Sequence, residues 1–255
     1  TVRYTTQHMN SIRTVLVTGG ARGIGFETVK AFAAQPNVRV IALDKSFESS
    51  NVFPNNVQRL EYDLRRKTAS DFQSLVATLE PVHTLVNNAG TLFCPPPALD
   101  DLDSNGGLGF TPDQVDDILD TNLRAPVGLM EALAPQMIYR KEGRIVNVGS
   151  VSAFTGHPDL WYGVSKAGIL NATKTFASLL GAHGCTVNAV APGPTLTEMY
   201  ESLPQSRKDM VERTVNSGRP AHPREVAETI LWLGMSAPLY INGATIDVND
   251  SSYPR

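Results

Sequence analysis

The chain has 255 residues, 42% hydrophobic and 18% charged, which is ordinary for a soluble globular protein and long enough for one α/β domain. Its net charge of −3, without a run of Lys or Arg, argues against a nucleic-acid or anionic-membrane surface, and no apolar run is long enough to span a bilayer. Cys94 and Cys185 form no CxxC pair and the histidines have no metal-binding spacing, so we expect a reducing, cytoplasmic compartment and no metal site.

Residues 1–11 are polar and lack the apolar core of a signal peptide. We expect them to be a flexible extension or a remnant of an expression vector. A single domain should follow over residues 12–255, because no repeat or linker divides it. Its cofactor half should cover about residues 12–110, and its catalytic and substrate half about residues 111–255.

The domain begins with a strand, a glycine-rich turn and a helix. The apolar run Thr14–Val17 leads into TGGARGIG at residues 18–25, and a helical pattern follows. This order predicts a phosphate cradle, because backbone N–H groups and the helix N-terminus face the anion. The spacing is TGxxxGxG, so the GxGxxG fingerprint is not met. The expected dinucleotide-binding residues of the turn are Gly19, Arg22, Gly23, Ile24 and Gly25.

A second strand, Val38–Leu43, ends on Asp44. An acidic residue at this distance from the turn can accept hydrogen bonds from the adenosine ribose hydroxyls and would repel a 2′-phosphate. NAD is therefore favoured over NADP, although the nearby cations Lys45 and Arg22 could soften the preference. The alternative interpretation of Asp44 is a plain turn residue at the end of a strand.

A third strand, Val57–Tyr62, ends at Asp63 and Leu64, which we expect beside the adenine. The alternative for Asp63 is the N-cap of a helix over about residues 67–79. A fourth strand, Thr84–Val86, precedes small residues that allow a ligand close to the backbone. They are Asn87, Asn88, Ala89 and Gly90.

The irregular segment Phe93–Phe110 follows, rich in Pro, Gly and Asp. It is either a lid or binding loop or a surface excursion. Thr111, as N-cap, should then begin a long helix that runs toward Met137. Asn122 and Pro126 are unfavourable inside that helix, and such a break often marks a kink.

The stretch around Tyr162 suggests proton transfer. A fifth strand, Arg144–Val148, ends just before Ser150, and Tyr162 and Lys166 share one face of a following helix because they are four residues apart. An ammonium beside a phenol lowers the phenol pKa toward neutrality. Ser150 could then hold a carbonyl or alcohol oxygen while Tyr162 exchanges a proton with it. A surface Tyr and Lys one turn apart is the alternative.

The remaining pattern completes a sheet. A sixth strand, Thr186–Val190, ends in PGPTLT at residues 192–197, and the polar segment Glu198–Gly218 is predicted to be a mobile flap over the substrate. A helix over Pro223–Met235 and a strand over Ala244–Val248 follow.

Six motifs, in this order, make the chain resemble the short-chain dehydrogenase/reductase family from about Ile12 to Val248. They are TGGARGIG, NNAG, the Asn of TNLRAP, the Ser of NVGS, YGVSK and PGPTLT. The resemblance implies an α/β, single-domain Rossmann fold, with a doubly wound seven-stranded parallel sheet and helices on both faces. It also implies a homotetramer or dimer.

The same resemblance implies a catalytic tetrad. Tyr162 would be the general acid/base and Ser150 would polarise the substrate oxygen. Lys166 would lower the tyrosine pKa and bind the nicotinamide ribose, and Asn122 would steady a water that links Lys166 to solvent. The residues expected to flank the nicotinamide are Asn88, Ala89, Gly90, Pro192, Gly193, Thr195 and Thr197.

Two features depart from the family's pattern. The segment Phe93–Phe110 is longer than in compact members, which would reshape the substrate mouth. The chain after the last strand, Val248–Ser252, lacks the usual Asp-Gly-Gly, which weakens the expectation of the usual C-terminal subunit contact.

The leading hypothesis is an NAD(H)-dependent oxidoreductase that interconverts a small secondary alcohol, cyclic or polyol-like, and its ketone. An NADPH-dependent 3-oxoacyl-thioester reductase is the alternative, against which Asp44 and the lack of a basic patch for a carrier protein count. A non-catalytic dinucleotide-sensing protein would not need the tetrad. His157 fits a loop residue better than a second base, and Trp161 fits packing or an interface better than substrate stacking. The candidate substrate residues are Phe93, Ser152, Phe154, His157, Trp161, Pro194, Met199 and Tyr200.

Overall fold

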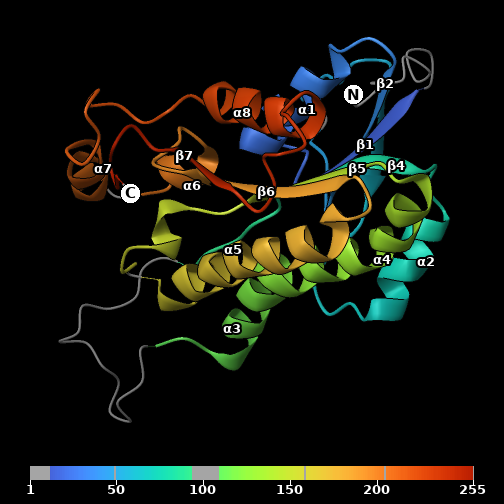
Figure 1. The fold of residues 1–255 in the computed structure, drawn as a ribbon. Helices are drawn as coiled ribbons and strands as arrows, with labels where there is room; N and C mark the ends of the chain where they lie inside the picture. Colours follow the sequence, from blue (N-terminus) through green and yellow to red (C-terminus); the bar gives the residue numbers. More distant parts are fainter. Residues whose placement is uncertain (1–11, 49, 94–108, 158, 204, 255) are drawn as a thin grey trace.

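A computed structural model describes residues 12–48, 50–93, 109–157, 159–203 and 205–254 (Figure 1). Seven parallel strands form one sheet in the order β3-β2-β1-β4-β5-β6-β7, which confirms the predicted fold class and every predicted strand. The strands are β1 (Arg13–Thr18), β2 (Val38–Asp44), β3 (Val57–Glu61), β4 (Val82–Asn87), β5 (Gly143–Val148), β6 (Cys185–Pro192) and β7 (Thr245–Val248). The strand order reverses between β1 and β4, where doubly wound sheets bind their ligands.

Helices cover both faces of the sheet (Figure 1). On one face α1 packs against α8, and on the other α4 packs against α2 and α5 while α3 lies along α5. The helices are α1 (Gly23–Ala33), α2 (Ala69–Ala77), α3 (Pro112–Leu119), α4 (Ala125–Arg140), α5 (Leu160–Gly181) and α8 (Pro223–Met235). Within the described residues, no helix combines the length and apolar character that a membrane span requires.

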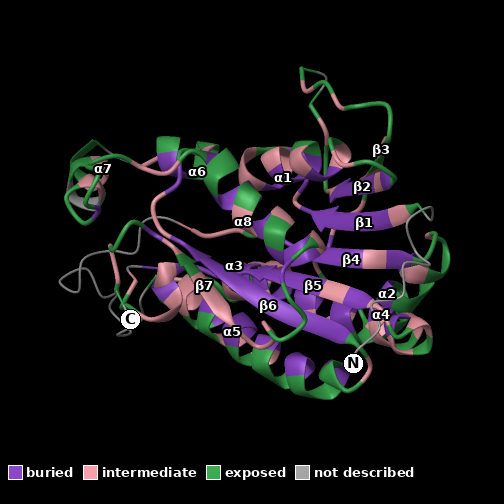
Figure 2. Cartoon of the chain, turned by 45° about the horizontal axis from the view of Figure 1, so that its top comes forward, coloured by how far each residue is buried: buried purple, intermediate pink, exposed green. Residues whose placement is uncertain are grey.

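The central strands supply side chains to two hydrophobic cores, because successive residues point to opposite faces of a sheet. In β1, Val15 and Val17 belong to the core under α1 and α8, whereas Leu16 belongs to the core under α4 and α5. Both faces of the central strands are therefore buried (Figure 2), which explains why these strands read as continuous apolar runs.

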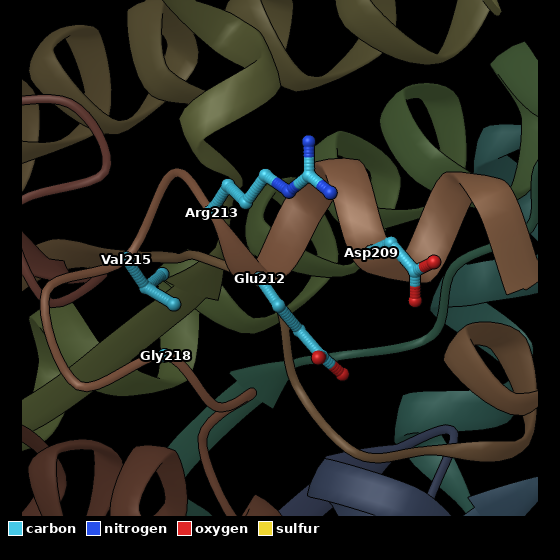
Figure 3. A pocket seen from close by; sticks show the side chains of 5 residues that line it. All are labelled: Asp209, Glu212, Arg213, Val215 and Gly218. Carbon is cyan, nitrogen blue, oxygen red and sulfur yellow. The ribbon is translucent and has the colours of Figure 1, made fainter.

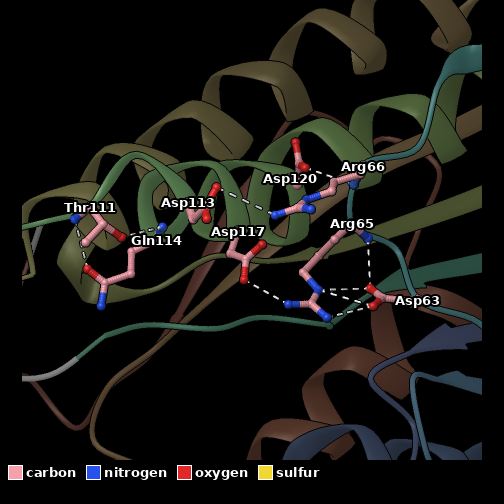
Figure 4. A network of polar contacts seen from close by, with 8 residues as sticks. All are labelled: Asp63, Arg65, Arg66, Thr111, Asp113, Gln114, Asp117 and Asp120. Atoms are coloured by element: carbon pink, nitrogen blue, oxygen red, sulfur yellow. Dashed lines mark hydrogen bonds and ion pairs between the residues drawn. The ribbon is translucent and has the colours of Figure 1, made fainter.

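The long helix predicted from Thr111 to Met137 is interrupted. Thr111 is the N-cap, as predicted: its side chain accepts from the Gln114 amide, and the Gln114 side chain returns a bond to the Thr111 amide (Figure 4). After α3, residues Asp120–Arg124 form a π-helical turn, η3, before α4 begins. The predicted break at Asn122 and Pro126 is thus a wider helical turn, a feature often found at functional sites.

The interpretation of Asp63 as a helix N-cap was wrong. Thr68 caps α2 in a capping box with Asp71, and the helix begins two residues later than predicted. Asp63 instead binds Arg65, whose guanidinium also reaches Asp117 of α3, both at 2.8 Å (Figure 4). The hydrogen bond from Arg65 lowers the pKa of Asp63 to about 2. These bonds tie the end of β3 to the helix that leads into η3.

In the turn after β7, two residues adopt a left-handed backbone conformation that normally favours glycine. Asp250 and Ser251 have φ values of 48° and 59°. The Asp250 carboxylate accepts the Ser217 amide at 2.6 Å, and its carbonyl accepts the Asn216 amide. Side-chain and backbone bonds therefore hold this turn without the glycines that the family's pattern has there.

A chain of buried polar side chains crosses the core from β4 through β5 to α5. Asn87 Nδ2 donates to Asn147 Oδ1 at 2.8 Å, and Asn147 Nδ2 donates to Thr173 Oγ1 at 2.9 Å. Thr186 on β6 is buried to a similar extent, but its hydroxyl has no hydrogen-bond partner in the part of the chain that the structure describes. The two threonines are therefore a matched pair, one bonded and one not.

Thr173→Val should lower the free energy of unfolding by about 1–3 kcal/mol, because it leaves the buried Asn147 Nδ2 with only a weak contact to the Met130 sulfur. Thr186→Val makes the same change in shape and should be neutral or stabilising, because it removes a buried hydroxyl without a partner. Urea unfolding followed by circular dichroism measures both. Equal losses in the two variants would contradict the role given to the network.

Candidate active site

The carboxyl ends of β1 and β4 are bound directly to each other. Asn88 Nδ2 donates to the carbonyls of Thr18 and Gly19 at 3.0 and 3.1 Å, and the amides of Asn88 and Ala89 donate to Thr18 Oγ1. The glycine-rich turn and the NNAG segment, which are some 70 residues apart in sequence, are thus one rigid unit. They meet at the point where the strand order reverses.

The turn fits a dinucleotide diphosphate. Gly19 has a φ of 65°, and a Cβ there would lie 2.8 Å from Ala89 Cα, while a Cβ on Gly25 would overlap the Gly19 carbonyl. α1 begins at Gly23, and among the described residues no side chain caps it: the Arg22 side chain makes no cap bond. The first N–H groups of α1 therefore remain available to an anion, as such cradles require.

Asp44 is half-buried and anchors this turn. Its Oδ2 accepts the Ala21 amide at 3.0 Å and its Oδ1 accepts the Lys45 amide at 2.8 Å. Arg22 points elsewhere and pairs with Glu198 at 2.6 Å in an exposed ion pair. The anionic side chain is thus held at the end of β2, and one of the two nearby cations is engaged by another carboxylate.

Lys166, a member of the predicted tetrad, is buried. Its Nζ donates to the carbonyl of Val148, at the end of β5, at 2.8 Å and lies 5.6 Å from the centroid of the Tyr162 ring. Gly90 is close as well: a Cβ on it would be 3.5 Å from Nζ. Burial lowers the pKa of Lys166 from its ordinary 10.5 to about 8, so the ammonium still predominates at pH 7.

Asn122, in η3, is buried and holds the chain that follows β4. Its Oδ1 accepts the Thr91 amide and its Nδ2 donates to the Thr91 carbonyl, both at 2.8 Å. Nδ2 also donates to Ser165 Oγ at 3.0 Å, and that hydroxyl donates to the Tyr162 carbonyl at 2.7 Å. Asn122 is thus linked to the backbone of Tyr162 through Ser165.

Ser150 follows β5 and caps the short 3₁₀ helix η4 (Val151–Ala153), where its Oγ accepts the Ser152 amide at 3.1 Å. η4 packs against the first turn of α5, and a Cβ on Gly163 would lie 3.3 Å from the Ser152 carbonyl. Ser150 is therefore beside the helix that carries Tyr162.

The predicted substrate residues differ in their contacts and in their burial. The His157 ring lies 5.2 Å from the Tyr162 ring, centroid to centroid, and Phe154 stacks on Tyr253 at 5.8 Å. Tyr200 is buried and donates to Glu212 at 2.6 Å; burial and that carboxylate raise the pKa of Tyr200 to about 12. Its hydroxyl is thus hydrogen-bonded within the segment Glu198–Gly218. The other predicted positions range from buried (Ser152) through partly buried (Phe93, Trp161, Pro194) to exposed (Met199).

The remaining predicted cofactor residues include several at the same carboxyl ends of the strands. Pro192 ends β6, the Gly193 amide donates to the Val248 carbonyl at 2.9 Å, and Thr195 Oγ1 donates to the Gly193 carbonyl at 3.1 Å. Ile24 and Leu64 contribute to the two hydrophobic cores.

The flap predicted over Glu198–Gly218 contains two helices, α6 (Glu198–Glu201), capped by Thr197, and α7 (Gln205–Glu212). α6 adjoins the glycine-rich turn through the pair of Glu198 with Arg22. An open hollow beside α7 is lined by residues of both charges and by none of the predicted site residues (Figure 3). Most of the predicted loop Phe93–Phe110 lies outside the described residues.

Sequence reasoning missed Asp159. Its side chain caps α5 by accepting the Tyr162 amide at 2.9 Å and also accepts the Phe93 amide at 2.8 Å. An Asp just before a helical pattern is a recognised N-cap signal, so its capping role could have been found. Its bond to Phe93 has no local signal.

The sequence model of the short chain dehydrogenase family matches residues 13–208. The chain therefore belongs to the short-chain dehydrogenase/reductase family, whose members are NAD(P)-dependent oxidoreductases.

Two similar curated proteins are 3-oxoacyl-[acyl-carrier-protein] reductases FabG. That of Staphylococcus aureus is 30% identical, over 96% of this chain and 100% of the relative; that of Thermotoga maritima is 32% identical, over 92% and 95%. A solved structure from Agrobacterium tumefaciens, provisionally assigned as a 2-deoxy-d-gluconate 3-dehydrogenase with bound NADP, superposes with a TM-score of 0.81. It is 25% identical, and the match covers 96% of this chain and 98% of that one.

Lys166→Met should stabilise the protein relative to wild type at neutral pH and less so at high pH. The folded state lowers the Lys166 pKa, so keeping that group charged costs about 3 kcal/mol at pH 7, a cost that disappears as the pH rises from about 8 to about 10.5. The stability difference between variant and wild type should therefore narrow by about 2–3 kcal/mol between pH 7 and pH 10.

Urea unfolding at the two pH values measures this change. Lys174→Met, which removes an exposed lysine from the same helix, is the control and should show no such change. A pH-independent difference for Lys166→Met would show that the lysine is not held in a desolvated site.

Proposed function

We propose that the protein is an NAD(H)-dependent oxidoreductase that interconverts a small secondary alcohol and its ketone, with Tyr162 as the general acid/base. The observation that carries this proposal is the buried Lys166 ammonium, 5.6 Å from the Tyr162 ring centroid. A positive charge in a buried site stabilises a phenolate and so eases proton exchange at the Tyr162 oxygen.

The residues divide the remaining work. A bound nicotinamide would supply or accept the hydride. Ser150 would donate a hydrogen bond to the substrate oxygen, while Tyr162 gives or takes the proton at that atom. Lys166 would keep its charge beside the phenol and bind the nicotinamide ribose. Asn122, which grips the backbone of Thr91, would steady a water leading from Lys166 to solvent.

Cofactor binding would use the edge where β1 and β4 meet. The N-terminus of α1 and the backbone of Gly19, Gly23 and Gly25 suit the diphosphate. The chain after β3, at Asp63, would lie beside the adenine. The carboxylate of Asp44 suits ribose hydroxyls and opposes a 2′-phosphate, which supports NAD(H), as does the pairing of Arg22 with Glu198.

The neighbouring segments would complete the pocket. Asn88, Ala89 and Gly90 would lie on one side of the nicotinamide, and the chain from Pro192 through Gly193 and Thr195 to Thr197 on the other. His157, whose ring lies beside that of Tyr162, has the best support of the candidate substrate residues.

A second candidate activity is NADPH-dependent reduction of 3-oxoacyl thioesters. The similarity to the FabG proteins favours it, and the bound NADP in the Agrobacterium tumefaciens structure is consistent with NADPH. The provisional assignment of that structure to a deoxygluconate favours a polyol-like substrate instead. A non-catalytic sensor has less support, because all four tetrad residues are present and Asn122 is linked to the backbone of Tyr162.

We further propose that residues 12–255 form one domain, with its cofactor half before about residue 110, because a single sheet contains strands from both halves. The free, buried thiol of Cys185 is compatible with a reducing compartment such as the cytoplasm. A homo-oligomer, dimer or tetramer, would be the usual form for this family.

Tyr162→Phe should lower kcat by a factor of about 10² to 10⁴, because it removes only the proton-exchanging hydroxyl. The dissociation constant for NADH should stay within about twofold of wild type, since the ring and its neighbours remain. Oxidation of NADH with a panel of oxo sugar acids and 3-oxoacyl thioesters measures the first, and NADH fluorescence measures the second. Unchanged turnover in this variant would refute the assigned role.

Wild type should have a higher kcat/KM with NADH than with NADPH. Asp44→Ser should reduce the ratio of kcat/KM for NADH to kcat/KM for NADPH at least about 10-fold, because it removes the charge that opposes a 2′-phosphate. Glu142→Gln is the control and should leave this ratio unchanged, because it removes a negative charge just before β5, at the amino ends of the strands. A wild-type preference for NADPH, together with faster turnover of 3-oxoacyl thioesters, would favour the second candidate.

A further inference from the structure

Asp159 is a fully buried carboxylate that joins three segments of the site. Its Oδ1 accepts the Tyr162 amide at 2.9 Å, its Oδ2 accepts the Phe93 amide at 2.8 Å, and its own amide donates to His157 Nδ1 at 3.1 Å. A buried anion requires such hydrogen bonds, since desolvation without them is costly. Here one of the two donors to the carboxylate, the Phe93 amide, lies 66 residues from Asp159 in sequence.

Helix capping does not account for this arrangement. Capping needs one acceptor oxygen, and Ser, Asn and Asp perform it about equally well. The second oxygen of Asp159 serves the long-range bond to Phe93. Asp159 therefore also binds a distant segment of the chain, which an ordinary N-cap residue does not do.

The segment from Thr91 to Phe93 is held at both ends. Asn122 binds the amide and the carbonyl of Thr91, while Asp159 binds the amide of Phe93. Both connections continue to Tyr162: Asp159 accepts its amide, and Asn122 reaches its carbonyl through Ser165. The result is a closed ring of hydrogen bonds that includes both backbone polar groups of Tyr162.

We propose that Asp159 is a positioning residue for Tyr162. It locks the first turn of α5 to the Thr91–Phe93 segment and thereby sets the place of the phenol relative to Lys166. Through its amide it also holds the His157 ring beside the phenol ring. The inference rests on the proposed function, in which Tyr162 exchanges the proton. A displacement of about 1 Å in such a group can cost about 10²-fold in rate.

Asp159→Asn and Asp159→Ser test the proposal, because both keep a good cap for α5 and neither can accept the Phe93 amide as the carboxylate does. In the Asn variant a side-chain NH₂ would face that amide, donor against donor. We expect kcat to fall about 10- to 100-fold, with KM changed less than kcat and the NADH dissociation constant within about twofold. Thr68→Ser, a cap exchange on the distant α2, should leave all three unchanged.

Amide hydrogen exchange gives a readout that does not depend on activity. In both Asp159 variants, exchange should accelerate at least about 10-fold at Phe93 and in the first turn of α5, while β6 keeps its protection. General unfolding would instead accelerate exchange throughout the sheet and would overturn the proposal. So would wild-type kcat in both variants, or unchanged exchange at Phe93.

The proposed function can fail separately. If wild type turned over no alcohol or ketone while exchange at Phe93 and in α5 still responded to Asp159, the link between Asp159 and Tyr162 would be supported and the assigned activity contradicted.

Discussion

The buried ammonium of Lys166 is the constraint on which the rest of the site depends. A charge in the protein interior is costly unless it is bonded, and Lys166 is bonded by the carbonyl that ends β5. Its pKa of about 8 leaves it charged at neutral pH despite full burial. The fold supports this charge by bringing α5 against the carboxyl end of β5, where Lys166 Nζ lies 5.6 Å from the centroid of the Tyr162 ring.

Hydrogen bonds from the surrounding segments hold the backbone of Tyr162, which carries the ring. The π-helical turn η3 directs Asn122 into the site, Asn122 and Asp159 grip the two ends of the Thr91–Phe93 segment, and both connect to the backbone of Tyr162. On the other side, Asn88 fastens the glycine-rich turn to β4. The glycine-rich turn and the backbone of Tyr162 are therefore both connected to the chain that follows β4, which suits the proposed reaction between a dinucleotide and a substrate.

Much of the fold was predictable from the sequence, because the signals for its strands and helix ends are local. Continuous apolar runs identified the central strands because both faces of the sheet are buried there, and the poor helix propensity at Asn122 and Pro126 marked the π-helical turn. Of the two roles predicted for Asp63, the alternative of a helix cap was wrong, since the stronger capping box of Thr68 and Asp71 lies five residues on.

The features that sequence reasoning could not reach depend on contacts between distant segments. The bond from Asp159 to Phe93 spans 66 residues, and Tyr200 was expected at a substrate pocket although its hydroxyl binds Glu212 within the flap. Likewise, the turn at Asp250 and Ser251 forms without glycine because Ser217 and Asn216, more than 30 residues earlier, bind it.

The most direct test of the proposed roles of Lys166 and Tyr162 is a crystal structure of the protein with NADH bound. We expect the diphosphate at the N-terminus of α1, and the nicotinamide between the Asn88–Gly90 and Pro192–Thr195 segments. We also expect Lys166 Nζ to bind the nicotinamide ribose and the Tyr162 hydroxyl to face the reactive ring carbon. A nicotinamide bound away from Tyr162, or a Lys166 Nζ without contact to the dinucleotide, would contradict these roles.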